Sequence, residues 1–119
     1  MDTDLTKIQD LIERPRESLA VELKRWIYPD QPEGKAKIVK ATLALRNFNG
    51  GYLVIGFDNN TLEPDKEHVP SNVMDMFHVD KIQVLISKFS SEPFEVSIEF
   101  PEREGQQYPV IEVPSGIRT

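Results

Sequence analysis

The sequence predicts an α+β fold, in which a mixed β-sheet with a terminal β-hairpin is packed by about three helices. Three observations support this prediction. Apolar residues recur at helical spacing in three segments, one short run is apolar without interruption, and the last third of the chain alternates apolar with polar residues around a glycine-containing turn. Residues 44–58 organise the pattern, because they join the principal helix to the most apolar strand through Gly50 and Gly51.

Length and composition fit one globular domain, residues 1–119, with a core at about residues 17–115. Hydrophobic residues make up 39% and charged residues 29%, which is ordinary for a globular protein. Cysteine is absent, so no disulfide framework or thiolate metal site is expected, and a reducing cytoplasmic location is predicted. No apolar run is long enough to span a bilayer, so no membrane partner is expected.

Charge and the end of the chain bound the function further. The formal net charge of −6 argues against a protein that coats polyanions generally, although a local basic face is compatible with it. The residues after position 113 give no signal of a domain end. We therefore expect an N-terminal fragment of a longer protein, with further domains after it.

The first half of the chain predicts a helix, a strand and a second helix. A short helix before Pro15, capped by residues 2–4, has an apolar stripe formed by Leu5, Ile8, Leu11 and Ile12. Residues 18–27 alternate as a strand does, with one buried face formed by Leu19, Val21 and Leu23. Residues 35–48 are predicted to form the principal helix, with a stripe of Ile38, Ala41, Leu45 and Phe48.

The second half begins at the paired glycines, which allow a tight turn into a strand at residues 52–55 that is buried on both faces. Gly56 predicts a bulge or a close approach of another part of the chain, and Asp58 begins a turn. A polar connection over residues 59–72 and a helical turn from Val73 follow. A helix at 79–89 comes next, with an apolar stripe of Ile82, Leu85, Ile86 and Phe89. Residues 94–100 and 108–113 form the hairpin, with Pro109 at an edge or at a strand start.

Two groups of charged residues are candidates for function. Lys35, Lys37, Lys40 and Arg46 bring four positive charges and no acid into the principal helix, as either a solvated face or a phosphate-contacting surface. Glu17 and Glu22 lie five residues apart, so they converge only if the chain bends near Ser18, and otherwise they face solvent.

Several other residues have a structural and a functional interpretation. Trp26 and Tyr28 either stack on bases or anchor the end of their strand in the core. Asn47 is either a helix C-cap or a ligand contact, and Lys24 is either a phosphate contact or the exposed side of a strand.

Three motifs follow in order along the chain: Glu17-Ser18-Leu19-Ala20-Val21-Glu22-Leu23-Lys24, a helix end with Ala44 and Asn47, and Gly50-Gly51-Tyr52-Leu53-Val54-Ile55-Gly56-Phe57-Asp58. Together they resemble the AlbA_2 domain, also called the Schlafen AlbA-type domain, over about residues 17–115. The sequence departs from the family pattern at Leu23, at Leu45 and Arg46, at Phe48 and at Asn59.

The resemblance implies a nucleic-acid-binding module, often fused to further domains in regulator-like proteins. Related Schlafen proteins use acidic residues of this module for metal-dependent cleavage of structured RNA. Their glutamate pair falls on Glu17 and Glu22, and their third carboxylate falls near Asp58 or Asn59. An amide at the third position would weaken binding of Mg²⁺ or Mn²⁺, which need convergent hard oxygen ligands.

Three functions therefore compete. The first is a module that binds DNA or structured RNA, with phosphates held by Lys24, Lys35, Lys37, Lys40 and Arg46, a contact from Asn47, and close approach at Gly50 and Gly51. The second is a metal-dependent endoribonuclease that uses Glu17, Glu22 and Asp58 with Mg²⁺ or Mn²⁺. The third is a non-catalytic interaction or dimerisation domain, and a homodimer is expected if the hairpin edge at Pro109 needs a cover.

Overall fold

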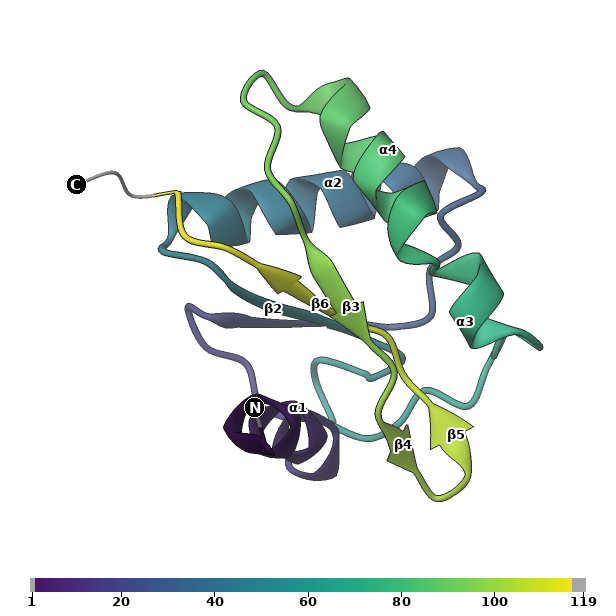
Figure 1. The fold of residues 1–119 in the computed structure, drawn as a ribbon. Coiled ribbons are helices and arrows are strands. Elements are labelled where there is room, and N and C mark those ends of the chain that lie inside the picture. The colour runs from purple at the N-terminus through teal and green to yellow at the C-terminus, as the bar shows by residue number, and fades with distance from the viewer. Residues whose placement is uncertain (1, 117–119) are drawn as a thin grey trace.

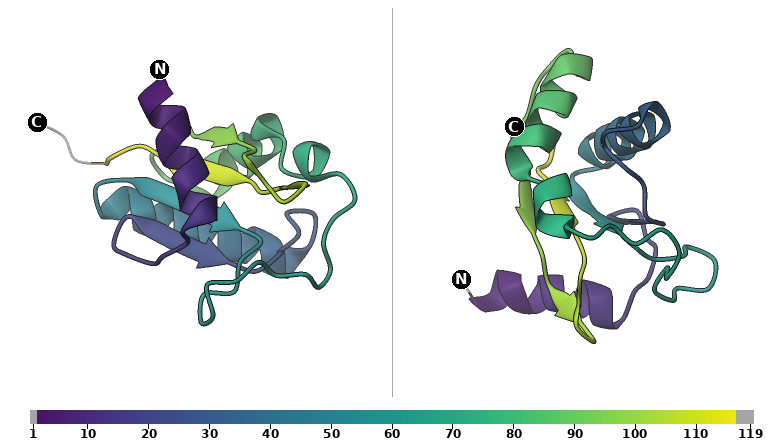
Figure 2. Two further views of the ribbon diagram at one scale, coloured as in Figure 1. Left: turned by 90° about the horizontal axis from the view of Figure 1, so that it is seen from below. Right: turned by 90° about the vertical axis from the view of Figure 1, so that its right-hand side faces the viewer.

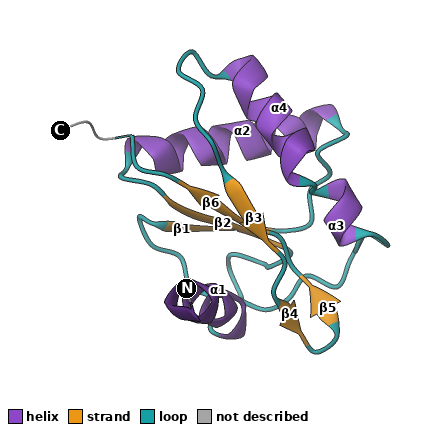
Figure 3. Ribbon diagram, viewed as in Figure 1, coloured by secondary structure: helices purple, strands orange, loops and turns teal. Residues whose placement is uncertain are grey.

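The computed structural model describes residues 2–116, with side chains described from Leu5 onward. At its centre is a four-stranded sheet with the order β1-β2-β6-β3, formed by β1 (Val21–Lys24), β2 (Gly51–Ile55), β6 (Val110–Val113) and β3 (Ser97–Glu99). β1 runs parallel to β2, whereas the other two pairs are antiparallel (Figure 1, Figure 3). The predicted α+β fold with a mixed sheet is confirmed.

Helices cover both faces of this sheet. α2 (Pro32–Asn47) and α4 (Val79–Phe89) lie side by side on one face, and α1 (Asp2–Glu13) crosses the other (Figure 1, Figure 2). α3 (Val73–Met76) is a single turn before α4. The core between the layers contains fully buried side chains from the sheet and the three long helices: Leu11, Ile12, Leu23, Ile38, Leu53, Ile55, Ile82, Ile86 and Ile111. Across residues 2–116, no helix combines the length and the apolar character needed to cross a membrane.

The helices begin and end close to their predicted limits. α1 begins at Asp2 and ends before Pro15, as predicted, whereas Leu5, predicted on its apolar stripe, is exposed. The predicted capping by residues 2–4 lies outside the described side chains. α2 begins at Pro32, three residues before the predicted start. A proline is suited to the first turn of a helix, because the N–H that it lacks would have no hydrogen-bond partner there. Phe48, predicted on the buried stripe, is the C-cap residue and is exposed. α4 has the predicted bounds, and Ile82, Leu85 and Ile86 of its predicted apolar stripe are buried, but Phe89, predicted on the same stripe, is exposed.

The turn from α2 into β2 requires its glycines. Gly50 and Gly51 have φ values of +84° and +151°, and the N–H of Gly50 donates to the carbonyl oxygen of Leu45 at 2.7 Å. A Cβ on Gly50 would lie 2.5 Å from the carbonyl oxygen of Val113, and one on Gly51 would lie 2.2 Å from that of Ala20. The chain's own backbone therefore fills the space that the missing side chains leave. From Tyr52 to Ile55 every residue of β2 is buried, as predicted.

β1 is shorter than the predicted strand at residues 18–27. It covers only four residues, and Leu19, predicted on the buried face, is 75% exposed. The chain bends instead, because Ser18 and Val21 exchange backbone hydrogen bonds of 3.1 and 3.4 Å. This tight bend supplies hydrogen-bond partners for the backbone N–H and carbonyl groups of Val21, which β1 would otherwise present unpaired at the outer edge of the sheet.

The terminal hairpin also differs from the prediction in extent. Between β3 and β6 lies a small two-stranded extension, β4 (Glu102–Arg103) and β5 (Gln106–Gln107), whose turn is at Glu104 and Gly105. Pro109 precedes β6, so its predicted place at a strand start is confirmed. β6 is a central strand, paired with β2 and β3. The argument for a homodimer from an uncovered edge at Pro109 is therefore wrong.

Trp26 anchors the end of β1 in the core. Its ring stacks on Tyr108 with centroids 5.7 Å apart, and its backbone and indole N–H groups both donate to Asp65, at 3.1 and 2.8 Å. The predicted close approach at Gly56 occurs here, since a Cβ would lie 2.6 Å from Cδ1 of Tyr108. The N–H groups of Gly56 and Phe57 both donate to the carbonyl oxygen of Lys24. The structural interpretation of Trp26 is confirmed.

Candidate nucleic-acid interface

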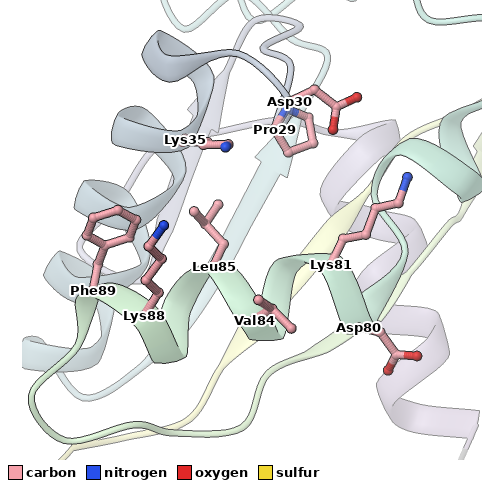
Figure 4. A pocket seen from close by; sticks show the side chains of 9 residues that line it. All are labelled: Pro29, Asp30, Lys35, Asp80, Lys81, Val84, Leu85, Lys88 and Phe89. Carbon is pink, nitrogen blue, oxygen red and sulfur yellow. The ribbon is translucent and has the colours of Figure 1, made fainter.

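A groove runs between α2 and α4 on the outer side of the helical layer. It consists of three hollows of about 570, 620 and 300 Å³, and all three are bordered by Phe89 at the end of α4. We call them together the α2–α4 groove. Figure 4 shows the first hollow, with Lys35 of α2 facing Lys88, Leu85 and Lys81 of α4.

The spacing of residues along the helices explains which side chains line this groove. On α4, Ile82, Leu85 and Ile86 are buried in the core, which leaves an adjacent stripe formed by Lys81, Val84 and Lys88. On α2, the side chains that border the groove recur at intervals of three and four: Lys35, Ala36, Val39, Lys40, Leu43, Arg46 and Asn47. Each helix thus directs one stripe to the core and the next to the groove.

The groove collects lysines that have no acidic partner. Lys35, Lys40, Lys81 and Lys88 make no ion pair within residues 2–116, whereas most of the other cations in that range do. Asp30 and Asp80 also line the first hollow, but the Asp80 carboxylate points away from Lys35 (Figure 4). Five cations (Lys35, Lys40, Lys81, Lys88 and Arg46) and three acids (Asp30, Asp80 and Glu92) line the three hollows, so this face of an acidic protein has a small local excess of positive charge.

Two of these lysines were missed in the sequence analysis. Lys81 and Lys88 are separated along the sequence from the basic cluster at residues 35–46, so no run of basic residues marks them. The only sequence feature that links them to the groove is their position next to the apolar stripe of α4 at Ile82, Leu85 and Ile86. That signal has meaning only once α4 is known to pack against α2.

The remaining cations predicted to bind nucleic acid have partners in the protein. Lys37 pairs with Glu33 at 3.0 Å and Lys24 pairs with Glu22 at 3.4 Å. Arg46 donates to the carbonyl oxygens of residues 114 and 115, at 3.3 and 2.9 Å, and its guanidinium lies 4.8 Å from the centroid of the Phe94 ring. Arg46 therefore holds the end of the described chain against α2.

Asn47 and the glycine pair differ in accessibility. Asn47 is the last residue of α2, is exposed, and borders the third hollow next to Arg46. It is not the helix C-cap, which is Phe48. Gly50 is buried and Gly51 half-buried against the chain's own backbone. The geometry at the glycines therefore favours their structural interpretation.

The predicted carboxylates take part in other interactions. Glu17 accepts a hydrogen bond from the backbone N–H of Leu23 at 3.0 Å, across the bend at Ser18. Glu22 pairs with Lys24 on the same strand. The predicted bend exists, but it brings the Glu17 carboxylate to the edge of β1, where it caps an N–H that has no strand partner.

Asp58 closes the turn after β2. Its Oδ1 accepts from the N–H groups of Asn60 and Thr61 at 2.7 and 3.2 Å, and its Oδ2 accepts from the Arg25 guanidinium. The Asn60 N–H and the Arg25 guanidinium hold the pKa of the Asp58 carboxyl below its ordinary value. Among the side chains that the structure describes, no three His, Asp or Glu residues are grouped so that they could hold a metal ion. The described carboxylates therefore form no group of three that would supply a Mg²⁺ or Mn²⁺ site by itself.

Comparison with known proteins supports the fold. No protein-family profile and no curated protein matches the chain. A structure of the DIP2311 protein from Corynebacterium diphtheriae is similar, with a TM-score of 0.63 and 15% identity over 96% of this chain and 22% of that chain. A second is the N-terminal domain of a Nitrosomonas europaea protein described as related to the ATP-dependent DNA helicase RecG. It has a TM-score of 0.51 and 23% identity over 92% of this chain and 72% of that chain.

This chain thus spans only 22% of the length of the DIP2311 chain. Identities of 15% and 23% are evidence of a shared fold alone.

Proposed function

We propose that this chain is a nucleic-acid-binding module and that the α2–α4 groove is its binding surface. The observation that carries the proposal is the gathering of Lys35, Lys40, Lys81 and Lys88, without acidic partners, along one groove of a protein with a net charge of −6. Phosphates are the anions that such a row of flexible ammonium groups binds through charge alone. Asn47 extends the surface past Phe89, and Arg46 beside it would contact phosphate only by giving up its bonds to the carbonyl oxygens of residues 114 and 115.

The finer assignment is part of the same proposal. The ordered motifs favour an AlbA_2-like domain of the Schlafen type, acting as a DNA-binding, regulator-like module in the cytoplasm. The structural neighbour related to the DNA helicase RecG is consistent with such a domain at the N-terminus of a larger protein that acts on DNA. Structured RNA is the other polyanion that the same surface would accept.

Metal-dependent cleavage is less well supported than binding. Asp58 already accepts three hydrogen bonds, and Glu17 caps the Leu23 N–H, so both would have to exchange these partners for a metal ion. The proposed function therefore rests on binding and includes no catalytic step.

The test is binding of labelled duplex DNA and structured RNA, measured by fluorescence anisotropy over a salt series. Four contacting lysines predict a slope of log Kobs against log[salt] of about −3.6 for duplex DNA, so affinity should fall by about 150-fold between about 50 and 200 mM salt. The double variant Lys81→Ala/Lys88→Ala should reduce the slope to about −1.8, and the same salt change should then cost about 12-fold.

The matched control is Arg14→Ala/Arg16→Ala, which also removes two positive charges. Both arginines follow the end of α1 and pair with Asp10. This control should leave the slope unchanged. Equal effects of the two double variants would mean that net charge, and not the α2–α4 groove, governs binding. Absence of binding at any salt concentration would refute the proposed function, and cleavage that requires Mn²⁺ would favour the endoribonuclease.

A further inference from the structure

We infer that the α2–α4 groove accepts unstacked bases of single-stranded nucleic acid, with the ring of Phe89 as the stacking platform. This inference rests on the proposed function and specifies its ligand. The groove has a feature that phosphate binding alone does not explain, namely an apolar lining between the lysines. Val84 is 67% exposed and Phe89 is 55% exposed, although both belong to the most amphipathic helix of the chain.

Phe89 holds the central position in the groove. It borders all three hollows, so space adjoins its ring along both α2 and α4. The ammonium of Lys88 lies over the Phe89 ring, 5.6 Å from its centroid, so a stacking base would move this flexible cation toward its phosphate or use the other face of the ring. Stacking of a base on an exposed ring next to a phosphate-binding cation is the general arrangement of single-strand binding surfaces.

Cations and apolar side chains alternate along the groove. On α2 the order is Lys35, Ala36, Val39, Lys40, Leu43 and Arg46, so positive charges recur about every one and a half turns of the helix, with apolar contacts between them. A single strand has the same alternation, because each nucleotide offers one charged phosphate and one flat apolar base. An amphipathic peptide helix instead buries a continuous apolar stripe and keeps its charges at the rim.

A duplex fits the groove less well than a single strand. Its phosphates would reach the lysines at the rim, but its bases are stacked inside and offer Val84 and Phe89 only their edges, without a face for stacking. A single strand desolvates these side chains and also neutralises the lysines. Hollows of about 570 and 620 Å³ lie in the range of pockets that hold small organic groups.

The experiment compares the unmodified chain with Phe89→Ala and with the matched control Phe48→Ala, which removes another exposed phenylalanine, 58% exposed, outside the groove. The probes are labelled single-stranded DNA and RNA of about 20 nucleotides and the corresponding DNA duplex, at low salt. Loss of one stacked base predicts that Phe89→Ala raises the Kd for the single strands by about 5- to 150-fold. The duplex Kd should not change, and Phe48→Ala should change neither. The DNA and RNA arms show which sugar the groove prefers.

Phe89→Leu keeps apolar bulk but removes the aromatic face, so it should weaken single-strand binding nearly as much as Phe89→Ala. If both Phe89 variants bind single strands normally while Lys81→Ala/Lys88→Ala weakens every probe, the stacking inference is overturned and the proposed function stands. If the unmodified chain binds no probe, both are overturned. A Phe89-dependent complex with an acidic amphipathic peptide, without single-strand binding, would overturn the inference in favour of a protein partner.

Discussion

Gly56 lies where β2 meets the rings of Trp26 and Tyr108, and its replacement by alanine measures how tightly these rings are packed. The φ of +109° costs a residue with a Cβ about 1–2 kcal/mol. The new Cβ would lie 2.6 Å from Cδ1 of Tyr108 and 2.8 Å from Cζ2 of Trp26, and relief of such crowding in a packed core costs about 1–3 kcal/mol. Gly56→Ala should therefore lower the free energy of unfolding by about 2–5 kcal/mol.

Gly105 provides a matched control, because it has a φ of +82° but a Cβ there would meet no atom within 4 Å. Gly105→Ala should cost only the backbone strain, about 1–2 kcal/mol. Urea unfolding, followed through the fluorescence of Trp26, the single tryptophan, measures both variants against the unmodified chain. Equal losses for the two variants would refute the reasoning, because they would show that the rings move aside at no cost.

Three further predictions concern charged and titratable groups. Glu17→Ala removes the acceptor of the Leu23 N–H at the outer edge of β1 and should lower the unfolding free energy by about 1–2 kcal/mol. Glu22→Gln loses only a surface ion pair and should lower it by less than about 0.5 kcal/mol. Urea midpoints that rank the two variants the other way would contradict the role of Glu17 at the edge. The pKa of Asp58 is lowered in the fold, so the carboxylate stabilises the fold above the unfolded pKa of about 3.9. This stabilisation is lost as the pH falls through the lower folded pKa. Asp58→Asn should therefore weaken the dependence of the urea midpoint on pH below about pH 4. Burial raises the pKa of Tyr108, so the neutral phenol contributes to stability below its unfolded pKa of about 10. This stability is lost as the pH rises through the higher folded pKa, and Tyr108→Phe should remove that loss. If the urea midpoint of the variant fell at alkaline pH as it does for the unmodified chain, Tyr108 would be excluded as the source.

The elements that were predicted correctly are those marked by local patterns. The helical stripe of α4 and the apolar run of β2 each fix a conformation from neighbouring residues alone. β1 was predicted too long because Leu19 continues the alternation of the strand, whereas the backbone bonds between Ser18 and Val21 bend the chain first. The bend is local, because its backbone bonds join Ser18 to Val21 and the Ser18 hydroxyl accepts a hydrogen bond from the Ala20 N–H. A serine at this position is the turn signal that the alternation through Leu19 conceals.

A different limit applies to the candidate interface. Lys35 and Lys40 were predicted because a basic run marks their helix, but their neighbours in the groove come from α4 and depend on how two helices pack. Arg46 shows the opposite case. Its charge fits the basic run, but the carbonyl oxygens of residues 114 and 115 bind its guanidinium from the far end of the chain. Composition shows that a cation is present, and only tertiary structure shows whether it is available to a ligand.

The distribution of the acidic residues gives the net charge of −6 a physical role. Glu95, Glu99 and Glu112 are exposed at and beside the edge strand β3, and Glu112 accepts a hydrogen bond from Ser97 across the pair. Carboxylates there discourage pairing of β3 with another strand, and they also repel a polyanion from that side of the molecule. An approaching nucleic acid would therefore meet repulsion at the sheet edge and attraction at the α2–α4 groove. Replacing these glutamates by glutamine should raise overall affinity while lowering the loss caused by Lys81→Ala/Lys88→Ala, because binding would then no longer be confined to the groove.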